Sequence, residues 1–513
     1  MRAAALGELT AAGMLMGQFE GAAVSDVDLF DQPMYVISIT DWPAAEFLLE
    51  RPVTSSGQAR LSLWRIDPAD PRSIPPPGPG GAFTSTTFSV MNPGNRTLHA
   101  PKRSFKIDVA PSVDDNWIHG LTRLNMASMY SDPSQMREAL AWDLFAKAEV
   151  PAARHTYARL AVNGVYRGLY SLIEPVDRRF LRTRFEANNR GNLYKAYCGD
   201  VGCATLEHRA DAAGDDSGKQ YFTPGNNDLT YRLKTNEDDA SSNTYDDLAV
   251  LIRTINGIGL PGGDRSFHSD EFRGAVENVL DAQSFLRWAG ANVLLGSWDN
   301  YFATPANYYL YNGGPTGKAE KSLTYPYFTF IPWDYENCLG IDFTGGTAWH
   351  YTDLMDWPGN TVRYWHRNGK PDRTSSIPLV ENLLANHEFA QYYLDHLEYL
   401  LDTDFTPAAI AARMGTPDGD GLWQRINQAA YLEAETPYAP AFTGRQFTND
   451  EVWSAAYTQE HLHHSNTSIE GISGYVTMRY DSARAQLATL RSSYSTGGGA
   501  SFGSTRRSAP ILA

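Results

Sequence analysis

The chain has 513 residues and is acidic, with 43 Lys and Arg against 59 Asp and Glu and a formal charge of −16. Hydrophobic residues make up 42% and charged residues 20%, which is typical of a globular chain and excludes a disordered one. So acidic a protein is poorly suited to a nucleic-acid backbone, which requires a basic face, and we expect no nucleic-acid partner. The chain has no run of about 18 apolar residues, so we expect no transmembrane segment.

Composition divides the chain into four parts. Residues 1–29 hold a short, interrupted apolar stretch, which is a weak match to a signal peptide and is interpreted as an N-terminal extension. Residues 30–180 are rich in strand signals. Residues 181–490 hold mixed signals and become helical from about residue 378. Residues 491–513 are rich in Ser, Gly and Arg and predict a flexible tail.

The first elements in chain order are strands. Residues 34–41 predict a strand, and the Pro- and Gly-rich residues 74–81 predict a loop. Further strands are expected over residues 83–91 and 103–109. The signals therefore indicate a sheet early in the chain.

The residues around the last of these strands alternate in polarity. Phe105 and Ile107 fall on one face by the period of two, and Lys102 and Lys106 fall on the other. The apolar face would pack on a core, and the two amines could meet nucleotide phosphates. Solvated surface charges are the alternative interpretation of both lysines.

A helix is expected to begin at Pro133. Asp132 is a good N-cap, Pro133 suits the first helical position, and Gln135 stands where a capping box requires it. Pro151 ends the segment. An apolar stripe covers one side of this helix: Met136, Leu140, Leu144, Phe145 and Ala148.

Asn163-Gly164 separates two β-rich runs, residues 157–162 and 165–173, and is typical of a tight β-hairpin. Glu174 follows the second run, at the place where a kinase has the linker between its lobes. A solvated charge is again the alternative for this residue.

The region after this hairpin is polar. Residues 198–245 predict a long insertion with short strands. Cys198 and Cys203 in it are either a local disulfide, given an oxidising compartment, or two free thiols. The third cysteine, Cys338, is expected to be buried.

Helices return after the insertion. They are expected over about residues 245–257, 270–280 and 281–295, and the last starts after Asp281 and stops at Gly296. Two strands follow, over residues 307–312 and 327–333. These two strands would pair as an antiparallel hairpin.

Three polar residues flank this second hairpin. Asp299 follows the preceding helix, Asn307 opens the first strand and Asp334 closes the second. Because the start of one antiparallel strand lies beside the end of its partner, Asn307 and Asp334 are expected to be neighbours. A carboxylate and an amide oxygen suit Mg²⁺, and a second carboxylate could take a proton from an attacking hydroxyl. The alternative is that Asp299 caps a turn and Asp334 merely ends a strand.

Protein kinases use a comparable set of groups, with a base Asp, a metal-binding Asn and a second metal-binding Asp. The sequence has no His-Arg-Asp or Asp-Phe-Gly string. Upstream, Glu138 could orient a lysine as a kinase helix Glu does, and Arg137 is an alternative phosphate contact. For these two residues, too, a solvated charge is the alternative.

Six ordered stretches together resemble the spore-coat CotH kinase family, a group of atypical protein kinases. The likeness spans roughly residues 30 to 490, and the matching order is more specific than any single motif. The stretches are Pro-Lys-Arg-Ser-Phe-Lys at 101–106, Asp-Pro-Ser-Gln-Met-Arg-Glu at 132–138, Asn-Gly-Val-Tyr-Arg-Gly-Leu-Tyr at 163–170, Gly-Asn-Leu-Tyr-Lys at 191–195, Tyr-Arg-Leu-Lys-Thr-Asn at 231–236, and Asp299 with 307–311 and 332–336.

The resemblance implies an α+β, atypical protein-kinase-like fold of two lobes, with a β-rich N-terminal lobe and a mainly helical C-terminal lobe. It implies ATP with Mg²⁺ or Mn²⁺ as cofactors and transfer of the γ-phosphate to a Ser or Thr of a protein substrate. Asp299 would be the base and Asn307 and Asp334 the metal ligands. Lys195 joins Lys102 and Lys106 as a candidate phosphate contact. The family also implies an extracellular or cell-envelope location.

One stretch departs from the family pattern. Members have an Arg-Gly-x-Ser-Ser-Arg-like segment before the Pro-Lys motif, and here only Gly94 matches it clearly, while Arg96 stands nearby. If that segment holds nucleotide, an alternative follows. The chain would then be a catalytically impaired module that acts in the binding or assembly of an envelope, coat or secreted system.

Overall fold

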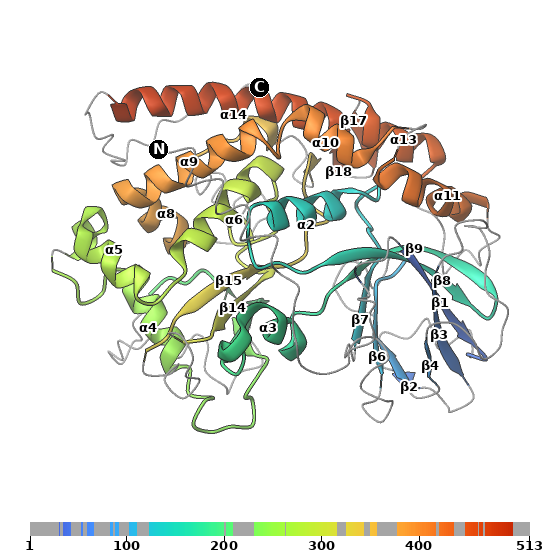
Figure 1. Cartoon of the computed structure of the whole chain (residues 1–513), viewed down its shortest axis with the longest axis horizontal. Coiled ribbons are helices and arrows are strands. Elements are labelled where there is room, and N and C mark those ends of the chain that lie inside the picture. Colours follow the sequence, from blue (N-terminus) through green and yellow to red (C-terminus); the bar gives the residue numbers. More distant parts are fainter. Residues whose placement is uncertain are drawn as a thin grey trace.

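The structure is a computed structural model that is mixed α+β (Figure 1). It describes residues 30, 34–42, 53–54, 59–65, 83–85, 88–91, 102–109, 123–199, 202–208, 230–261, 263–314, 325–342, 349–355, 377–416, 420–435, 447–459, 461–464 and 467–495. The predicted loop at 74–81 and the divergent segment around Gly94 lie outside these residues.

The first third of the chain builds a nine-stranded sheet, ordered β2-β5-β6-β7-β9-β8-β1-β3-β4. Strands β1 and β8 pair in parallel and the other neighbours are antiparallel. The strands are β1 (Met34–Thr40), β2 (Val53–Thr54), β3 (Arg60–Arg65), β4 (Phe83–Ser85), β5 (Phe88–Met91), β6 (Phe105–Val109), β7 (Arg123–Ala127), β8 (His155–Val162) and β9 (Val165–Ile173).

The single strand predicted over 83–91 is wrong. It is two strands, because β4 pairs with β3 whereas β5 pairs with β2 and β6, toward the opposite edge. The alternation in β6 is confirmed, with Phe105 and Ile107 buried and Lys106 half-buried. The predicted β8–β9 hairpin is confirmed as well. Asn163 and Gly164 have φ of 51° and 77°, the positive values that a type I′ turn requires of both residues.

Helix α2 (Arg137–Lys147) begins later than predicted, after an N-cap at Met136 that has no side-chain cap. Asp132 does not cap a helix at Pro133. Its carboxylate accepts the Ser134 and Arg137 N–H groups instead, and Gln135 has φ of 57°, which interrupts a helical start. The predicted apolar stripe is nevertheless buried from Met136 to Ala148.

The middle of the chain builds a second, antiparallel sheet ordered β13-β10-β14-β15. A two-stranded hairpin, β11 with β12, follows β10. Cys198 and Cys203 form a disulfide across it, which was one of the two predicted states of this pair. Cys338 is a buried free cysteine, as predicted. The strands are β10 (Asn192–Ala196), β11 (Cys198–Gly199), β12 (Gly202–Cys203), β13 (Tyr231–Leu233), β14 (Tyr308–Asn312) and β15 (Phe328–Pro332).

Helices predicted in this region are confirmed. They are α4 (Asp246–Ile255), α5 (Asp270–Glu277) and α6 (Ala282–Leu295), and α3 (Arg178–Phe185) precedes them. Asp281 caps α6 by accepting the Ser284 N–H at 3.0 Å, and Gly296 ends it with φ of 61°. Helix α6 is almost wholly buried and packs against α9, α2 and β15.

The C-terminal region is helical, as predicted, but also holds a small sheet ordered β16-β18-β17 that the prediction missed. Helix α14 continues to Ser495, into the predicted tail, and lies along the α9 side of the molecule (Figure 1). The elements are α8 (Pro378–Ala385), α9 (His387–Asp402), α10 (Pro407–Met414), α11 (Leu422–Glu435), α13 (Asn449–Tyr457), β16 (Ile341–Asp342), β17 (His461–His464), β18 (Thr467–Glu470) and α14 (Ile472–Ser495).

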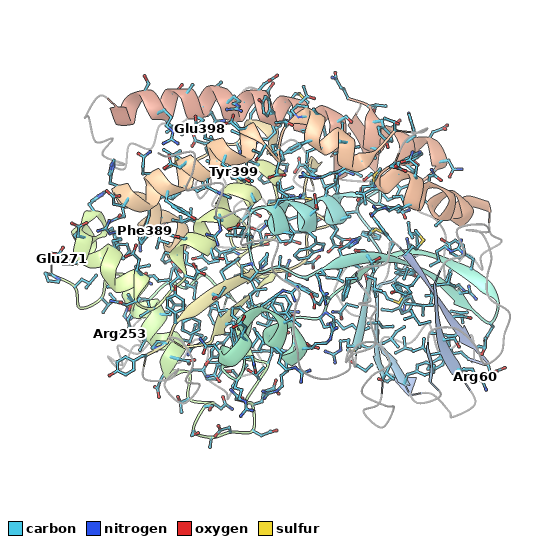
Figure 2. All side chains as sticks on the ribbon, in the orientation of Figure 1. Arg60, Arg253, Glu271, Phe389, Glu398 and Tyr399 are labelled. Carbon is cyan, nitrogen blue, oxygen red and sulfur yellow. A yellow bond between two sulfur atoms is a disulfide. The ribbon has the colours of Figure 1, made fainter. Side chains whose placement is uncertain are left out.

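Side chains from the helices and sheets pack into separate apolar clusters in the interior (Figure 2). One large apolar cluster joins α2, α6 and α9 to the second sheet, and another packs on the nine-stranded sheet. Within the described residues, no helix is both long and apolar enough to span a bilayer.

Candidate functional site

The open end of the β14–β15 hairpin carries Asn307 and Asp334, as predicted. Tyr308 pairs with Pro332, and the Trp333 N–H donates to the Asn307 carbonyl oxygen at 3.1 Å. Both polar residues have left-handed backbone, with φ of 53° at Asn307 and 65° at Asp334. Asn and Asp tolerate this conformation better than other non-glycine residues, so the sequence suits the turn out of the sheet.

The loop after α6 brings Asp299 to the same end. The Asn307 side-chain amide donates to the Asp299 carbonyl oxygen at 2.8 Å. The Asp299 carboxylate accepts the Thr304 hydroxyl at 2.6 Å on one oxygen and the Asn337 amide at 3.1 Å on the other. The direction of this carboxylate is therefore fixed by two donors. Oδ1 of Asn307 accepts no hydrogen bond within the described part of the chain, so its lone pairs are open to another partner.

Asp334 stands in an unusual electrostatic position. Its carboxylate accepts no hydrogen bond from any residue that the structure describes. Burial, and next the nearby charge of Asp299, raise the pKa of Asp334 to about 6, although Lys195 and Lys106 oppose that rise. An unpaired carboxylate in a desolvated place is costly for a protein unless a cation completes the site.

The donor set fits a hard divalent ion. One carboxylate oxygen of Asp334 and the amide oxygen of Asn307 are the oxygen ligands that Mg²⁺ takes while it keeps waters and phosphate oxygens. The described part of the chain has no group of three or more His, Cys, Asp or Glu arranged to hold a metal without such help.

Two lysines approach Asp334 from different sheets. Lys106 extends from β6 of the nine-stranded sheet, and burial, then Arg123 and Lys234, lower its pKa. Lys195 extends from β10 of the second sheet, where it pairs with Tyr309 and Arg232 across the strands. Burial, and then Lys106, lower the pKa of Lys195 to about 8.

Aromatic rings surround the Lys195 amine. Its Nζ lies 5.2 Å from the ring centroid of Tyr197, 5.5 Å from that of Tyr309 and 5.9 Å from that of Trp333. This cage was not predicted, because it depends on the pairing of β10 with β14. The alternating aromatic residues beside Asn307 were its only sequence signal. Lys102 lies elsewhere, with its Nζ 5.0 Å over the Tyr170 ring.

Arg137 is engaged within the protein. It is fully buried and forms a 2.5 Å ion pair with Asp132, and its guanidinium also donates to the carbonyl oxygens of Leu339 and Glu470. These bonds tie the start of α2 to the segment after Asp334. The side chain is occupied by structural partners and is not directed at a ligand.

Glu138 and Glu174 are buried carboxyls with different surroundings. Glu138 accepts the Ser171 hydroxyl at 2.8 Å, and burial, then Asp334, raise its pKa to about 8. It forms no ion pair with a lysine among the described residues, so the predicted lysine-orienting contact is not seen. Glu174 pairs with Arg154 at 2.8 Å and Arg184 at 2.6 Å. Burial opposes its ionisation, but these arginines outweigh burial and lower the pKa of Glu174.

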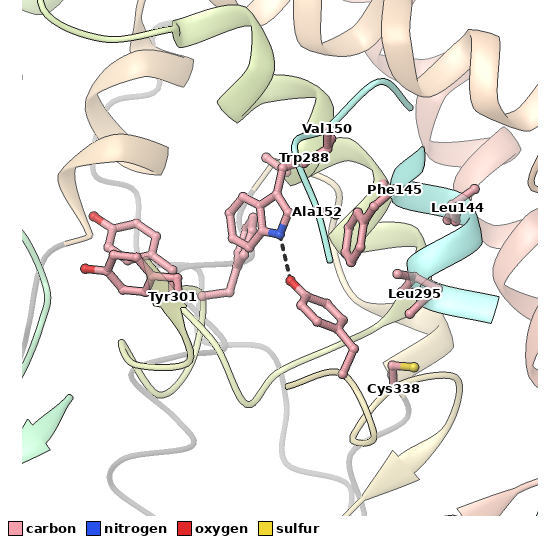
Figure 3. Packing of buried hydrophobic residues seen from close by; sticks show 14 of the residues in the cluster. Leu144, Phe145, Val150, Ala152, Trp288, Leu295, Tyr301 and Cys338 are labelled. Carbon is pink, nitrogen blue, oxygen red and sulfur yellow. Dashed lines mark hydrogen bonds between the residues drawn. The ribbon is translucent and has the colours of Figure 1, made fainter. Parts of the chain in front are cut away.

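The core holds Asp334 in place through its neighbour Tyr335. Trp288 of α6 donates its indole N–H to the Tyr335 hydroxyl at 2.6 Å, the bond drawn in Figure 3. Tyr335 in turn donates to Asn292 of α6 at 3.1 Å. Glu336 accepts the Tyr130 N–H at 3.1 Å, on the other side. The short segment from Asp334 to Asn337 is therefore fixed by α6 and by the loop that follows β7 of the nine-stranded sheet.

The arrangement defines an α+β protein whose polar site lies where two sheets meet, with two carboxylates, an amide and two lysines. The CotH kinase protein family model matches residues 92–464, and the chain belongs to this family.

Two curated relatives are similar over part of their length. The inner spore coat protein H of Bacillus subtilis (strain 168) is 26% identical over 228 residues, 44% of this chain and 52% of the relative. Invasin CotH2 of Rhizopus delemar is 22% identical over 325 residues, 63% of this chain and 48% of the relative. The chain thus spans about half the length of the curated relatives it matches.

Proposed function

We propose that this chain is a divalent-metal-dependent kinase that transfers the γ-phosphate of ATP to a Ser or Thr hydroxyl of a protein. The nine-stranded sheet would serve as the N-terminal lobe and the helix-rich remainder as the C-terminal lobe. The observation that carries the proposal is the half-buried Asp334 carboxylate, which accepts no hydrogen bond from the described residues and lies near Asn307 and two lysines. A phosphate chain with its metal would satisfy all of these groups at once.

Each residue has a role in this proposal. Asp334 and the Asn307 amide oxygen would hold Mg²⁺ or Mn²⁺, which neutralises phosphate charge when bound. Asp299, whose carboxylate is oriented by Thr304 and Asn337, would accept the proton of the acceptor hydroxyl.

Lys106 and Lys195 would contact phosphate oxygens. Burial lowers the pKa of Lys195 to about 8 in the protein alone, so a bound anion would favour its charged form. The rings around Lys195 attract its cation without supplying a competing carboxylate. Lys102, stacked on Tyr170, is the weaker candidate for this role.

The relatives' names supply a location for the proposal. One relative is named an inner spore coat protein, and the other is named an invasin. We infer that this chain acts in a coat or cell envelope, on a protein acceptor there. A disulfide between Cys198 and Cys203 agrees with an oxidising compartment.

Calorimetric titration of ATP with Mg²⁺ or Mn²⁺, and then with chelator, tests this function together with transfer from γ-labelled ATP to a degenerate Ser/Thr peptide library. Asp334→Ala should lose both metal-dependent binding and transfer. Asp299→Asn should keep metal-dependent binding and lose transfer by about 10²- to 10⁴-fold. Asp238→Asn, an exposed carboxylate change, is the matched control and should alter neither.

Transfer by Asp334→Ala would defeat the site assignment. If the parent binds no nucleotide under any metal condition, the chain is the binding or assembly module that the divergent Gly94 segment suggests. Release of free phosphate without a labelled acceptor would instead point to a phosphoesterase.

A further inference from the structure

The Cys198–Cys203 disulfide lies directly beside the candidate site. Cys198 follows Tyr197, one of the rings around Lys195, and pairs with Cys203 across the β11–β12 hairpin. Cys198 is exposed and Cys203 is half-buried, so the bond is accessible to a reductant. No role assigned above to the site uses this pair.

The residues after Cys203 fasten the loop that carries Asp299 and Asn307. The Ala204 N–H donates to the Pro305 carbonyl oxygen at 2.8 Å, and Sγ of Cys198 lies 3.9 Å from the same oxygen. The Tyr301 hydroxyl donates to the Thr205 carbonyl oxygen at 2.8 Å.

A second set of hydroxyl contacts extends this fastening to the β14 strand. The Tyr308 hydroxyl donates to the Ala204 carbonyl oxygen, and it lies 3.1 Å from the Tyr231 hydroxyl. Tyr231 accepts the Leu206 N–H at 3.1 Å. Ala204 and Thr205 thus contact the chain after Asp299 at Tyr301, at Pro305 and at Tyr308.

We propose that the Cys198–Cys203 disulfide positions the loop that carries Asp299 and Asn307. The oxidised protein is then the active form, and reduction lowers the rate of phosphate transfer. The cross-link joins Cys198, two residues beyond the end of β10, to Cys203, which precedes the residues bonded to Pro305 and Tyr301. Without the disulfide, residues 204–206 gain conformational freedom, and the loop that carries Asp299 loses a fixed support. The inference rests on the proposed kinase function and assigns a redox control to the same site.

The chemical step is thiol–disulfide exchange with a dithiol reductant. A thiolate of the reductant attacks one sulfur, the other cysteine leaves as a thiolate and takes up a proton, and a mixed disulfide forms. The second thiol of the reductant then displaces the protein sulfur. Two electrons and two protons end on Cys198 and Cys203, and the reductant becomes a cyclic disulfide.

The test compares kcat and the KM for ATP in oxidised protein and in protein treated with dithiothreitol, with the peptide library as acceptor and thiols counted by alkylation and mass spectrometry. Reduction should lower kcat by about 10- to 100-fold, because misplacement of about 1 Å costs that much. The KM for ATP should rise by a smaller factor than kcat falls, because the loop carries Asn307 whereas Asp334 and Lys106 lie outside it. Reoxidation should restore kcat, which a merely structural loss would not do.

Variants separate this bond from other effects of the reductant. Cys338→Ala removes the buried thiol and should respond to dithiothreitol as the parent does. The Cys198→Ser, Cys203→Ser double variant should have the low kcat in either condition. If that variant does not fold, the reversible parent experiment decides. Equal kcat in parent protein of verified oxidised and reduced state would overturn the proposal.

Hydrogen exchange keeps this inference distinct from the proposed function. Amides of residues 299–308 should exchange faster after reduction, whether or not the protein transfers phosphate. If no transfer occurs in any state but exchange rises, the kinase function fails and the positioning survives. Unchanged exchange at 299–308 would overturn the positioning.

Discussion

Asp334 and Glu174 are carboxyls at the ends of strands, half-buried and fully buried respectively, yet their surroundings are opposite. Glu174 lies among Arg154, Arg179 and Arg184, and its pKa is lowered although burial opposes ionisation. Asp334 accepts no hydrogen bond from the described residues, and burial and Asp299 raise its pKa to about 6. The protein itself supplies the ion-pair partners of Glu174. Among the described residues it supplies no hydrogen-bond donor to Asp334.

The difference separates stability from function. A buried charge with full pairing holds two parts of a fold together, and its loss leaves arginines unpaired. A desolvated charge without pairing costs the fold free energy, and such charges are typical of functional sites. Substitutions at the two residues should therefore have opposite consequences.

The largest expected effect is on transfer by Asp334→Asn. Losing the ligand charge should lower the transfer rate by about 10³-fold or more. The free energy of unfolding of the metal-free protein should stay equal or rise, because the variant removes a desolvated charge that accepts no hydrogen bond from the described residues, and Asn tolerates the left-handed backbone. Labelled-ATP transfer and urea unfolding measure the two. A clear loss of stability would contradict the comparison.

Glu174→Gln should have the reverse outcome. Removing the charge from a buried cluster of arginines should lower the free energy of unfolding by about 3–5 kcal/mol, as read from urea denaturation. The folded fraction should keep its transfer activity. Glu237→Gln is the control, since its exposed pair with Lys234 at 3.9 Å should be worth under about 1 kcal/mol.

The pH dependence of metal affinity sharpens the comparison. Asp334 must be ionised to bind a cation, so Mn²⁺ affinity should fall by about tenfold per pH unit below about 6, the raised pKa of Asp334. Titration followed by electron paramagnetic resonance checks this. An affinity that stays constant down to about pH 4.5 would show that Asp334 is not the ligand.

A smaller effect is expected at Glu138, whose pKa is raised to about 8 by burial and by Asp334. Because the pKa of Glu138 is higher in the folded state, its contribution to the free energy of unfolding is fully present at pH values below its pKa in the unfolded chain. The contribution is lost as pH rises through about 8. Glu138→Gln should therefore flatten the decline and gain on the order of 1 kcal/mol near pH 8.5, by thermal unfolding. An unchanged profile would place the titration elsewhere.

Local signals predicted the elements whose cause is local. The Asn163-Gly164 turn and the Asp281 and Gly296 caps each depend on residues adjacent in sequence, and the structure has all of them. The start of α2 could not be predicted in this way. Asp132 forms an ion pair with Arg137 instead of capping the helix. The Arg137 guanidinium also donates to the carbonyl oxygens of Leu339 and Glu470, far along the chain.

The site follows the same division. The meeting of Asn307 and Asp334 could be predicted, because antiparallel pairing requires it. The approach of Lys106 and the ring cage of Lys195 could not, because they depend on how two sheets sit together and on the pairing of β10 with β14. The kinase roles of these residues remain predictions.

The left-handed backbone at Asn307 and Asp334 affects how relatives should be judged. At these φ values of 53° and 65°, Asn, Asp and Gly are favoured whatever chemistry the site performs. A descendant that had lost phosphate transfer could therefore keep the same two letters for its backbone alone. An Asp aligned with Asp334 is therefore weak evidence for activity. A β-branched residue at that position would indicate that both the left-handed turn and the chemistry had been lost.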